Sequence, residues 1–146
     1  MDKVYDICII GGGASGMTAA IKAKETNPNL AIVILEKNEA LGKKLKATGN
    51  GRCNMTNLKA INYIENMKFF TALGVMSTSE DERVYPYSLD SSDIVLLLKE
   101  KLIDMGVEIL TEKTVNDIFK DGELFKVSYN HEKVVSKRML IIKGGE

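Results

Sequence analysis

A glycine-rich loop between an apolar run and a helical pattern constrains the fold of this chain more than any other stretch. The apolar residues 7–10 lead into a loop at 11–16, in which three glycines fit the spacing G-x-G-x-x-G: Gly11, Gly13 and Gly16. In this pattern the first glycine allows a tight turn, the second lets the backbone approach a pyrophosphate, and the third lets the helix pack closely on the strand. Because the N-terminus of the helix then faces the anion, this glycine loop predicts a dinucleotide site.

A second strand and an acidic residue complete a βαβ unit predicted over residues 4–36. The helical pattern after the loop stops at Pro28, because proline cannot continue a helix, and the apolar run at 30–35 is typical of a parallel strand covered on both faces. Glu36, twenty residues after Gly16, can accept hydrogen bonds from both ribose hydroxyls of an adenosine and would repel a 2′-phosphate. The unit therefore favours FAD or NAD over NADP, and the motif alone does not separate FAD from NAD.

The alternative for this stretch is an ordinary βαβ unit whose glycines serve only the turn. A substitution distinguishes the two hypotheses. If the loop binds a dinucleotide, alanine at Gly11 or Gly13 should weaken binding far more than folding, because the added methyl group blocks the approach of backbone to phosphate. If the glycines serve only the turn, the ligand affinity should not change.

Composition and charge limit the other classes of function. The chain has 146 residues, 45% of them hydrophobic, which is enough for one globular core, and a single domain over 1–146 is expected. Twenty basic residues balance twenty acidic ones, so the net charge gives no argument for nucleic acid or an anionic membrane as a partner. No apolar run approaches the roughly 20 residues of a membrane span, and the N-terminus does not resemble a signal peptide, which predicts a cytoplasmic location.

Residue types that carry catalysis or bind metal are few. Two cysteines, Cys8 and Cys53, and the single His131 predict neither a disulfide framework nor a metal site. His131 lies in an expected turn and is more typical of a surface residue than of a general base. No Ser/His/Asp set or carboxylate pair stands out, so no catalytic residue is predicted.

The middle of the chain predicts a helix followed by a strand over residues 92–110. Asp90 and its neighbours offer an N-cap for a helix from 92 to about 104, Gly106 is its stop, and a short strand follows at 107–110. Before it, an apolar pattern at 69–73 is typical of a helix end, with Gly74 as the stop. Residues 77–91 are expected to form a loop.

Three β-rich runs then predict an antiparallel β-meander over 114–136: residues 114–120, 124–129 and 134–136, the first two joined by a hairpin turn at Asp121-Gly122. Four runs are expected to be parallel strands: residues 4–10, 31–35, 107–110 and the closing strand at 138–142. These elements predict an α/β fold, a Rossmann-like doubly wound parallel sheet with the meander inserted. Its ligand crevice is expected where Gly11, Glu36 and Gly144 converge.

Residues 40–64 form a basic segment without any acidic residue. Its cations are Lys43, Lys44, Lys46, Arg52 and Lys59. Its glycines and asparagines allow sharp turns whose N–H groups could bind an anion. The segment is therefore expected to lie near the pyrophosphate, and the alternative is a solvated basic loop.

Several motifs in and after this segment resemble those of the BaiN-like NAD(P)/FAD-dependent oxidoreductase family, flavoproteins with a glutathione-reductase-type FAD domain. The motifs are Gly42-Lys43-Lys44-Leu45, Thr48-Gly49-Asn50-Gly51-Arg52-Cys53-Asn54, Thr56-Asn57 and Arg83-Val84-Tyr85-Pro86. With the opening at 5–16, the resemblance covers nearly the whole chain. It implies a flavoprotein loop at 40–57 and an FAD whose ADP half binds the glycine loop and Glu36.

The resemblance also implies a set of cofactor-binding residues: Gly11, Gly13, Ala14, Ser15, Gly16, Glu36, Lys37, Lys44, Thr48, Gly49, Asn50, Gly51, Arg52, Cys53, Val115 and Gly144. Cys53 is interpreted as structural, because no second cysteine stands in a C-x-x-C arrangement with it. The flavin would carry the electrons, with NAD(P)H as a candidate donor and a small-molecule substrate that the sequence does not identify.

The chain departs from the family in three respects. The segment between Asn57 and Phe69 is shorter than in the family, Lys143 precedes Gly144 where the family has Ala-Thr, and the chain stops before the family's substrate domain. The chain therefore resembles an N-terminal part or a shortened version. The enzyme hypothesis, a flavin-dependent oxidoreductase, stands beside a truncated, non-catalytic dinucleotide-binding fragment or subunit. An NAD-dependent dehydrogenase fits less well, because the 48–54 loop matches the flavoprotein pattern.

Overall fold

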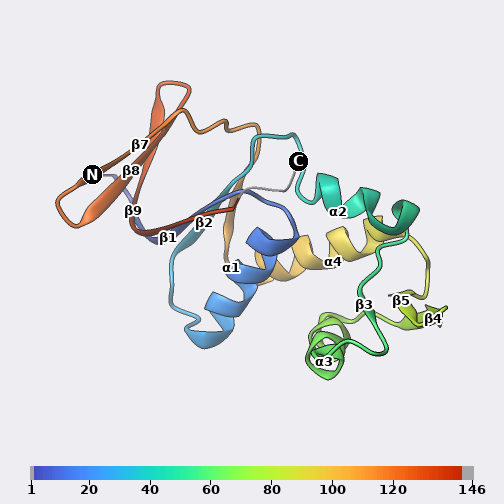
Figure 1. Cartoon of the computed structure of the whole chain (residues 1–146). Helices are drawn as coiled ribbons and strands as arrows, with labels where there is room; N and C mark the ends of the chain where they lie inside the picture. Colours follow the sequence, from blue (N-terminus) through green and yellow to red (C-terminus); the bar gives the residue numbers. More distant parts are fainter. Residues whose placement is uncertain (1, 143–146) are drawn as a thin grey trace. The chain divides into compact units, whose positions relative to one another are not determined.

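The structure is a computed structural model that describes residues 2–142 (Figure 1). Its internal contacts divide the chain into two compact units, Met1–Leu41 with Leu102–Glu146 as the first and Gly42–Lys101 as the second. This division does not decide whether either unit folds independently, so the single domain over 1–146 stays a prediction. In the described part of the chain, no helix has the length and apolar character needed to cross a membrane.

The first unit is built on a six-stranded sheet with the order β6-β2-β1-β9-β8-β7. The strands are β1 (Val4–Ile10), β2 (Ile32–Leu35), β6 (Glu108–Leu110), β7 (Asp117–Asp121), β8 (Leu124–Tyr129) and β9 (Glu132–Ile141). The pairs β1–β2, β1–β9 and β2–β6 are parallel, whereas β7–β8 and β8–β9 are antiparallel. The predicted α/β class, with four parallel strands and an antiparallel meander, is confirmed.

Strand β9 corrects one prediction, because the runs expected at 134–136 and 138–142 form a single strand. Its first half pairs antiparallel with β8, and its second half pairs parallel with β1. Val135 pairs with Lys126 on one side and Val4 on the other. The polar Ser136 lies within this strand, its side chain is buried, and its hydroxyl donates a hydrogen bond to the carbonyl oxygen of Arg138. A satisfied polar group can therefore continue a strand.

The sheet of the first unit is packed on both faces. Helix α1 (Ala14–Thr26) packs against β1 and β2, and the residues that it buries are Gly16, Met17, Ala20, Ile21 and Lys24. Successive residues of β1 and β2 point to opposite faces. A second cluster joins the parallel strands to the meander: Tyr5, Cys8, Val33, Leu35, Val127, Tyr129 and Val134. The meander therefore supplies part of the core and is more than a surface hairpin, although β7 begins at Asp117 rather than at Thr114 as predicted.

The second unit contains mainly short elements. They are α2 (Lys43–Ala47), a 3-10 helix η1 (Thr48–Gly51), β3 (Thr56–Asn57), α3 (Tyr63–Leu73), β4 (Ser77–Glu80), β5 (Arg83–Pro86) and most of α4 (Ser91–Asp104). As predicted, α3 ends at Gly74, which has a φ of 96°. The backbone N–H of Ser92 donates to the Asp90 carboxylate at 2.8 Å, which supports the predicted N-cap of α4.

Residues 77–86 correct a second prediction, because they form a hairpin instead of a loop. Strands β4 and β5 pair antiparallel and, with β3, make a three-stranded sheet in the order β3-β5-β4. The turn residues Asp81 and Glu82 have φ values of 48° and 67°. The sequence did not signal this hairpin, because the turn lacks glycine and β4 is polar and mostly exposed.

Candidate functional site

The first and third glycines of the loop are required by close backbone contacts. Gly11 has a φ of +117°, and a Cβ at this position would lie 2.6 Å from the carbonyl oxygen of Ile142. A Cβ on Gly16 would lie 1.9 Å from the carbonyl oxygen of Gly11 and 3.4 Å from the side chain of Ile9. The tight turn at Gly11 and the close helix–strand packing at Gly16 therefore follow the roles expected from the motif.

Gly13 differs from its neighbours because no contact among the described residues 2–142 requires a glycine there. Its φ of −83° is accessible to any residue, and an added Cβ would meet no atom within 4 Å. Gly13 is the N-cap of α1, which has no side-chain capping hydrogen bond and no acidic residue in its first turn. The open space above Gly13 therefore adjoins a helix N-terminus, whose first N–H groups lack partners within the helix.

Glu36 lies beside this loop, held by its backbone. Its N–H donates to the carbonyl oxygen of Leu110 at 2.9 Å, and its own carbonyl oxygen accepts from the N–H of Lys113 at 2.9 Å. The residue is only 8% exposed. A Cβ on Gly12 would lie 3.2 Å from the Cβ of Glu36, so the loop and the acid are in direct proximity. The structure thus brings together the two parts of the motif that sequence analysis paired.

Gly12 and Leu41 are site residues that sequence analysis did not single out. A Cβ on Gly12 would lie 2.3 Å from Cδ2 of Leu41, so this leucine fills the space that a side chain at position 12 would need. The additional glycine within G-x-G was the available signal. The G-x-G-x-x-G pattern allows any residue at position 12, so the pattern did not mark Gly12 as a required glycine.

The remaining predicted residues of the first unit are Lys37, Val115 and Gly144. Lys37 is exposed. Val115 is partly buried and packs against the cluster that contains Cys8 and Val127, so its side chain contributes to the core. Gly144 lies outside the residues that the structure describes.

The predicted residues of the flavoprotein loop lie in the second unit. Lys44 is exposed on α2, and the Thr48 hydroxyl donates to the carbonyl oxygen of Leu45 at 2.7 Å, at the end of that helix. Asn50 has a φ of 56° and Gly51 a φ of 82°, and both belong to η1 together with Gly49. The contribution of these residues to a cofactor site stays a prediction.

Two cations of the basic segment are paired with acids from the β4–β5 hairpin. Arg52 forms an ion pair with Glu80 at 3.0 Å and stacks over the ring of Tyr85, 4.5 Å from its centroid. Lys59 pairs with Glu82 at 2.8 Å. Sequence analysis missed these pairs, because the acids come more than twenty positions after the cations in a hairpin that was expected to be a loop. The segment is therefore less positive than its sequence alone indicates.

The cysteines are buried and unsuited to act as thiolates. Cys53 is 2% exposed, and burial raises the pKa of its thiol, an effect that its hydrogen bond with Thr48 opposes. Burial alone raises the pKa of Cys8 to about 12. Burial thus favours the protonated form of both thiols, and the structural role expected for Cys53 stays a prediction. Within residues 2–142, no three His, Cys, Asp or Glu side chains are grouped to hold a metal ion.

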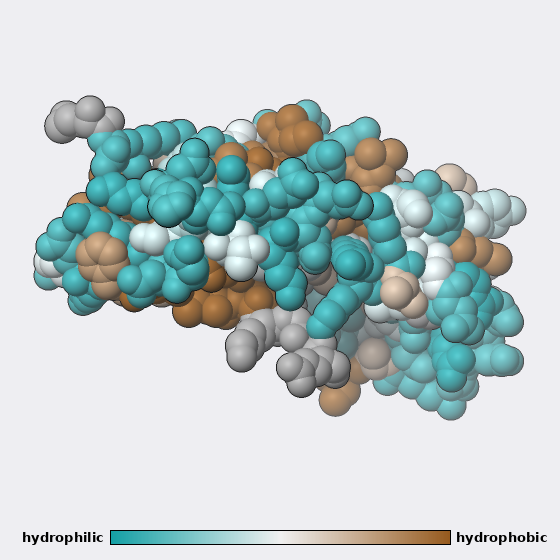
Figure 2. Space-filling view, turned by 90° about the horizontal axis from the view of Figure 1, so that it is seen from above, coloured by the Kyte–Doolittle hydropathy of each residue, from teal (hydrophilic) through white to brown (hydrophobic). Residues whose placement is uncertain are grey.

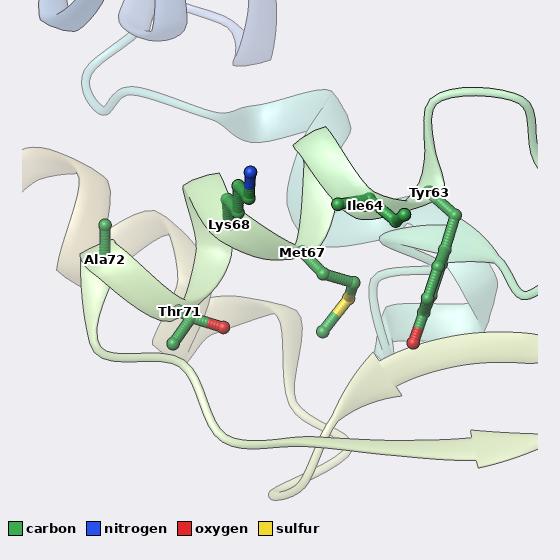
Figure 3. Close-up of a pocket in the computed structure, with 6 residues that line it drawn as sticks. All are labelled: Tyr63, Ile64, Met67, Lys68, Thr71 and Ala72. Atoms are coloured by element: carbon green, nitrogen blue, oxygen red, sulfur yellow. The ribbon is translucent and has the colours of Figure 1, made fainter.

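A hollow of about 530 Å³ lies on one side of α3 in the second unit (Figure 3). Its lining residues all come from this helix: Tyr63, Ile64, Met67, Lys68, Thr71 and Ala72. They include no carboxylate, cysteine or histidine. On the face shown in Figure 2, hydrophobic patches are separated by hydrophilic surface. The hollow therefore provides no catalytic constellation.

The part of the chain that matches a protein family contains the same motifs. Residues 5–71, which include the glycine loop, Glu36 and the flavoprotein loop, match the model of the HI0933-like protein Rossmann domain. The chain belongs to the HI0933-like family. This is the BaiN-like flavoprotein family that the motifs resemble, so that prediction is confirmed.

Curated relatives of this HI0933-like chain include oxidoreductases. It is 33% identical over 159 residues to a 3-dehydro-bile acid delta(4,6)-reductase from Clostridium scindens, an alignment that covers 96% of this chain and 39% of that protein. It is 27% identical over 144 residues to a ferredoxin–NADP reductase from Leuconostoc citreum, covering 99% of this chain and 34% of that protein. The chain thus spans well under half the length of these relatives.

Solved structures share the fold of the HI0933-like chain. Thermovibrio ammonificans THI4 matches with a TM-score of 0.71 and 14% identity, over 96% of this chain and 57% of that chain. Thioredoxin reductase from Streptococcus pyogenes matches with a TM-score of 0.60 and 21% identity, over 97% of this chain and 35% of that chain. These structures show a Rossmann-type fold for the chain, and the flavin-dependent oxidoreductase family rests on the family match and the relatives above.

Proposed function

We propose that this chain binds FAD and is the FAD-binding part of a flavin-dependent oxidoreductase. The observation that carries the proposal is Gly13: a glycine with an ordinary φ, open space above it and an uncapped helix beginning beside it. Neither backbone strain nor internal packing accounts for a glycine there. Close approach of a pyrophosphate to the backbone does account for it.

In this proposal the first unit holds the ADP half of the cofactor. The first-turn N–H groups of Ala14, Ser15 and Gly16 would donate to the pyrophosphate, where the helix N-terminus also favours negative charge. The Glu36 carboxylate would accept hydrogen bonds from the ribose hydroxyls. Lys44 and residues 48–53 would bind the middle of FAD, as the family resemblance implies. When bound, FAD supplies the redox chemistry and accepts electrons from a donor such as NAD(P)H.

The alternative is a non-catalytic dinucleotide-binding fragment or subunit. It is supported by the small share of each relative's length that the chain spans. The chain spans 39% of the length of the bile acid reductase and 34% of that of the ferredoxin–NADP reductase. The substrates in these names belong to the relatives, and the proposal for this chain extends only to its redox class. A cytoplasmic location stays a prediction.

Purified protein would test the proposal. We expect flavin absorbance after incubation with FAD and removal of free cofactor, or, if the flavin half finds few contacts, saturable binding of FAD and ADP with similar affinity in calorimetry. Absence of binding for both ligands would contradict the proposal. NAD(P)H oxidation above the rate of free flavin separates the enzyme from the non-catalytic alternative.

A further inference from the structure

We infer that Leu41 is a positioning residue that fixes the direction of the Glu36 carboxylate by filling the hollow left by Gly12. The inference rests on the proposed dinucleotide site and adds to it the device that selects a free ribose over a 2′-phosphate. Leu41 carries no charge and no hydrogen-bonding group, so its effect on the ligand would pass through Glu36.

The backbone around Glu36 is held from the side of β6. Its N–H and carbonyl groups bond to Leu110 and Lys113, and the carbonyl oxygen of Asn38 accepts from the N–H of Glu112 at 2.9 Å. These bonds fix the Cα–Cβ direction of Glu36 but leave its side-chain torsions undetermined. Within residues 2–142, its carboxylate accepts one hydrogen bond, from the N–H of Asn38 at a long 3.5 Å. Packing must therefore provide the remaining constraint.

Leu41, which is 3% exposed, is the neighbour placed to supply that packing, because its side chain lies over the buried Gly12. A Cβ at position 12 would lie 2.3 Å from Cδ2 of Leu41, 3.2 Å from Cβ of Glu36 and 3.5 Å from its Cγ. The leucine methyl group and the glutamate stem thus share one hollow over the same glycine. Filling this hollow restricts the rotamers available to the Glu36 stem.

The role inferred for Leu41 affects the selectivity between nucleotides with and without a 2′-phosphate more than the affinity for either one. A carboxylate held toward the ribose accepts hydrogen bonds from both hydroxyls and repels a 2′-phosphate placed there. If the carboxylate can rotate away, this repulsion becomes weaker. The affinity for a nucleotide with a 2′-phosphate then rises relative to the affinity for one without it. Loosening the packing at Leu41 should therefore reduce discrimination even where the protein remains folded.

The test compares AMP with adenosine 2′,5′-bisphosphate, which differ only by the 2′-phosphate, by calorimetry on the whole chain. We expect the wild type to prefer AMP by on the order of tenfold. Leu41→Ala should reduce this ratio by about threefold or more. Leu41→Met, which nearly conserves volume, should retain it. Gly12→Ala should also reduce it, because the methyl group displaces the flexible end of Leu41 and presses on Glu36.

Two controls separate positioning from a general loss of packing. Leu102 is also fully buried in the first unit. Leu102→Ala should lower the thermal midpoint without changing the nucleotide ratio. In a Glu36→Ala background, Leu41→Ala should leave the ratio unchanged, because the group through which it acts is gone.

The outcomes distinguish a failure of the proposed dinucleotide binding from a failure of the role given to Leu41. If the wild type binds neither nucleotide, the proposed function fails, and this inference fails with it. If the wild type binds and prefers AMP, but neither Leu41→Ala nor Gly12→Ala changes the ratio, only the role of Leu41 is overturned. Equal effects of Leu41→Ala with and without Glu36 would overturn it as well. If Leu41→Ala does not fold, Gly12→Ala decides.

Discussion

The candidate binding groups have different surroundings in the glycine loop of the first unit and in the basic segment of the second. In the glycine loop, close backbone contacts require Gly11 and Gly16, while Gly13 leaves its space open. In the basic segment, Arg52 and Lys59 are held by acids of the same unit. The space beside Gly13 is thus open to the proposed anion, whereas these two cations must exchange an existing partner to bind a phosphate.

This difference shows that a glycine motif predicts more about the folded structure than a run of charged residues does. Glycine spacing specifies backbone conformations, and these are set within a few residues of the loop. A charge acts through whatever opposite charge the fold brings within a few ångströms. Substitutions in the two regions should therefore produce effects of different kind and size.

The largest expected effect is on folding, at Gly16. Gly16→Ala places a methyl group 1.9 Å from the Gly11 carbonyl oxygen, which cannot move without displacing the loop. We expect a loss of about 3 kcal/mol or more in the free energy of unfolding, measured by chemical denaturation. Gly11→Ala should behave similarly, because its φ of +117° and its contact with Ile142 also exclude a side chain. The contact at Gly11 thus argues for an effect of Gly11→Ala on folding as well as on binding, and the expectation that binding falls far more stays a prediction. A stable Gly16→Ala variant would contradict the packing role.

Glu36→Ala should produce the next largest effect, on binding. Loss of the hydrogen bonds from ribose to a charged group should cost on the order of 1.5 to 3 kcal/mol in ADP affinity. Calorimetric titration with ADP measures it, and NADP should compete poorly with FAD in the wild type. Equal displacement of FAD by NADP and NAD from the wild type would exclude the role given to Glu36.

Gly13→Ala should weaken nucleotide binding without weakening the fold. The added methyl group meets no atom of the residues that the structure describes, but it enters the space expected for the pyrophosphate. We expect about a tenfold loss in ADP affinity, or about 1.4 kcal/mol, with an unchanged unfolding midpoint.

Gly74→Ala is the matched control for Gly13→Ala. Its Cβ would also meet nothing, but its φ of +96° is unfavourable for alanine, so it should lose about 1 kcal/mol of stability. Unchanged ADP affinity in Gly13→Ala would show that the loop serves only as a turn.

A smaller effect is expected from the ion pairs of the second unit. Glu80→Gln releases Arg52, and the change in the free energy of unfolding should stay below about 1 kcal/mol, because Glu80 is largely exposed. If Arg52 contributes to the cofactor site, FAD affinity should rise at low salt and return at high salt. Glu82→Gln removes the same charge but releases Lys59, which is not a predicted ligand. Equal gains from both variants would indicate net charge alone.

The smallest expected effect is a pH dependence in the first unit. A hydrogen bond from the backbone N–H of Ala31, followed by one from Lys137, lowers the pKa of Asp6. Because the folded-state pKa is depressed, this contribution is present above the ordinary aspartate pKa and disappears as the pH falls through the lowered value. Asp6→Asn should flatten the acid limb of a urea-denaturation series. An identical acid limb in the variant would exclude this linkage.

Much of the first unit was predictable because its signals are local. The apolar runs of β1 and β2, the glycine spacing and the Asp121-Gly122 turn each act within a few residues, and the structure confirms the elements they predict. The β4–β5 hairpin was not predicted, because its turn at Asp81 and Glu82, both at positive φ, contains no glycine. The single strand β9 was also missed, since Ser136 continues it by pairing with Tyr5 of β1 and Phe125 of β8, which are distant in sequence.

By itself the sequence determined the Rossmann-type unit, the glycine loop and the acid at the end of β2, because backbone conformation and strand periodicity are encoded locally. Only the tertiary structure decided that Gly13 faces open space, that Leu41 fills the hollow over Gly12 beside Glu36, and that Arg52 is paired with Glu80. These are contacts between residues that the chain brings together only on folding. Their strength depends on distances of a few ångströms, which no spacing along the sequence specifies.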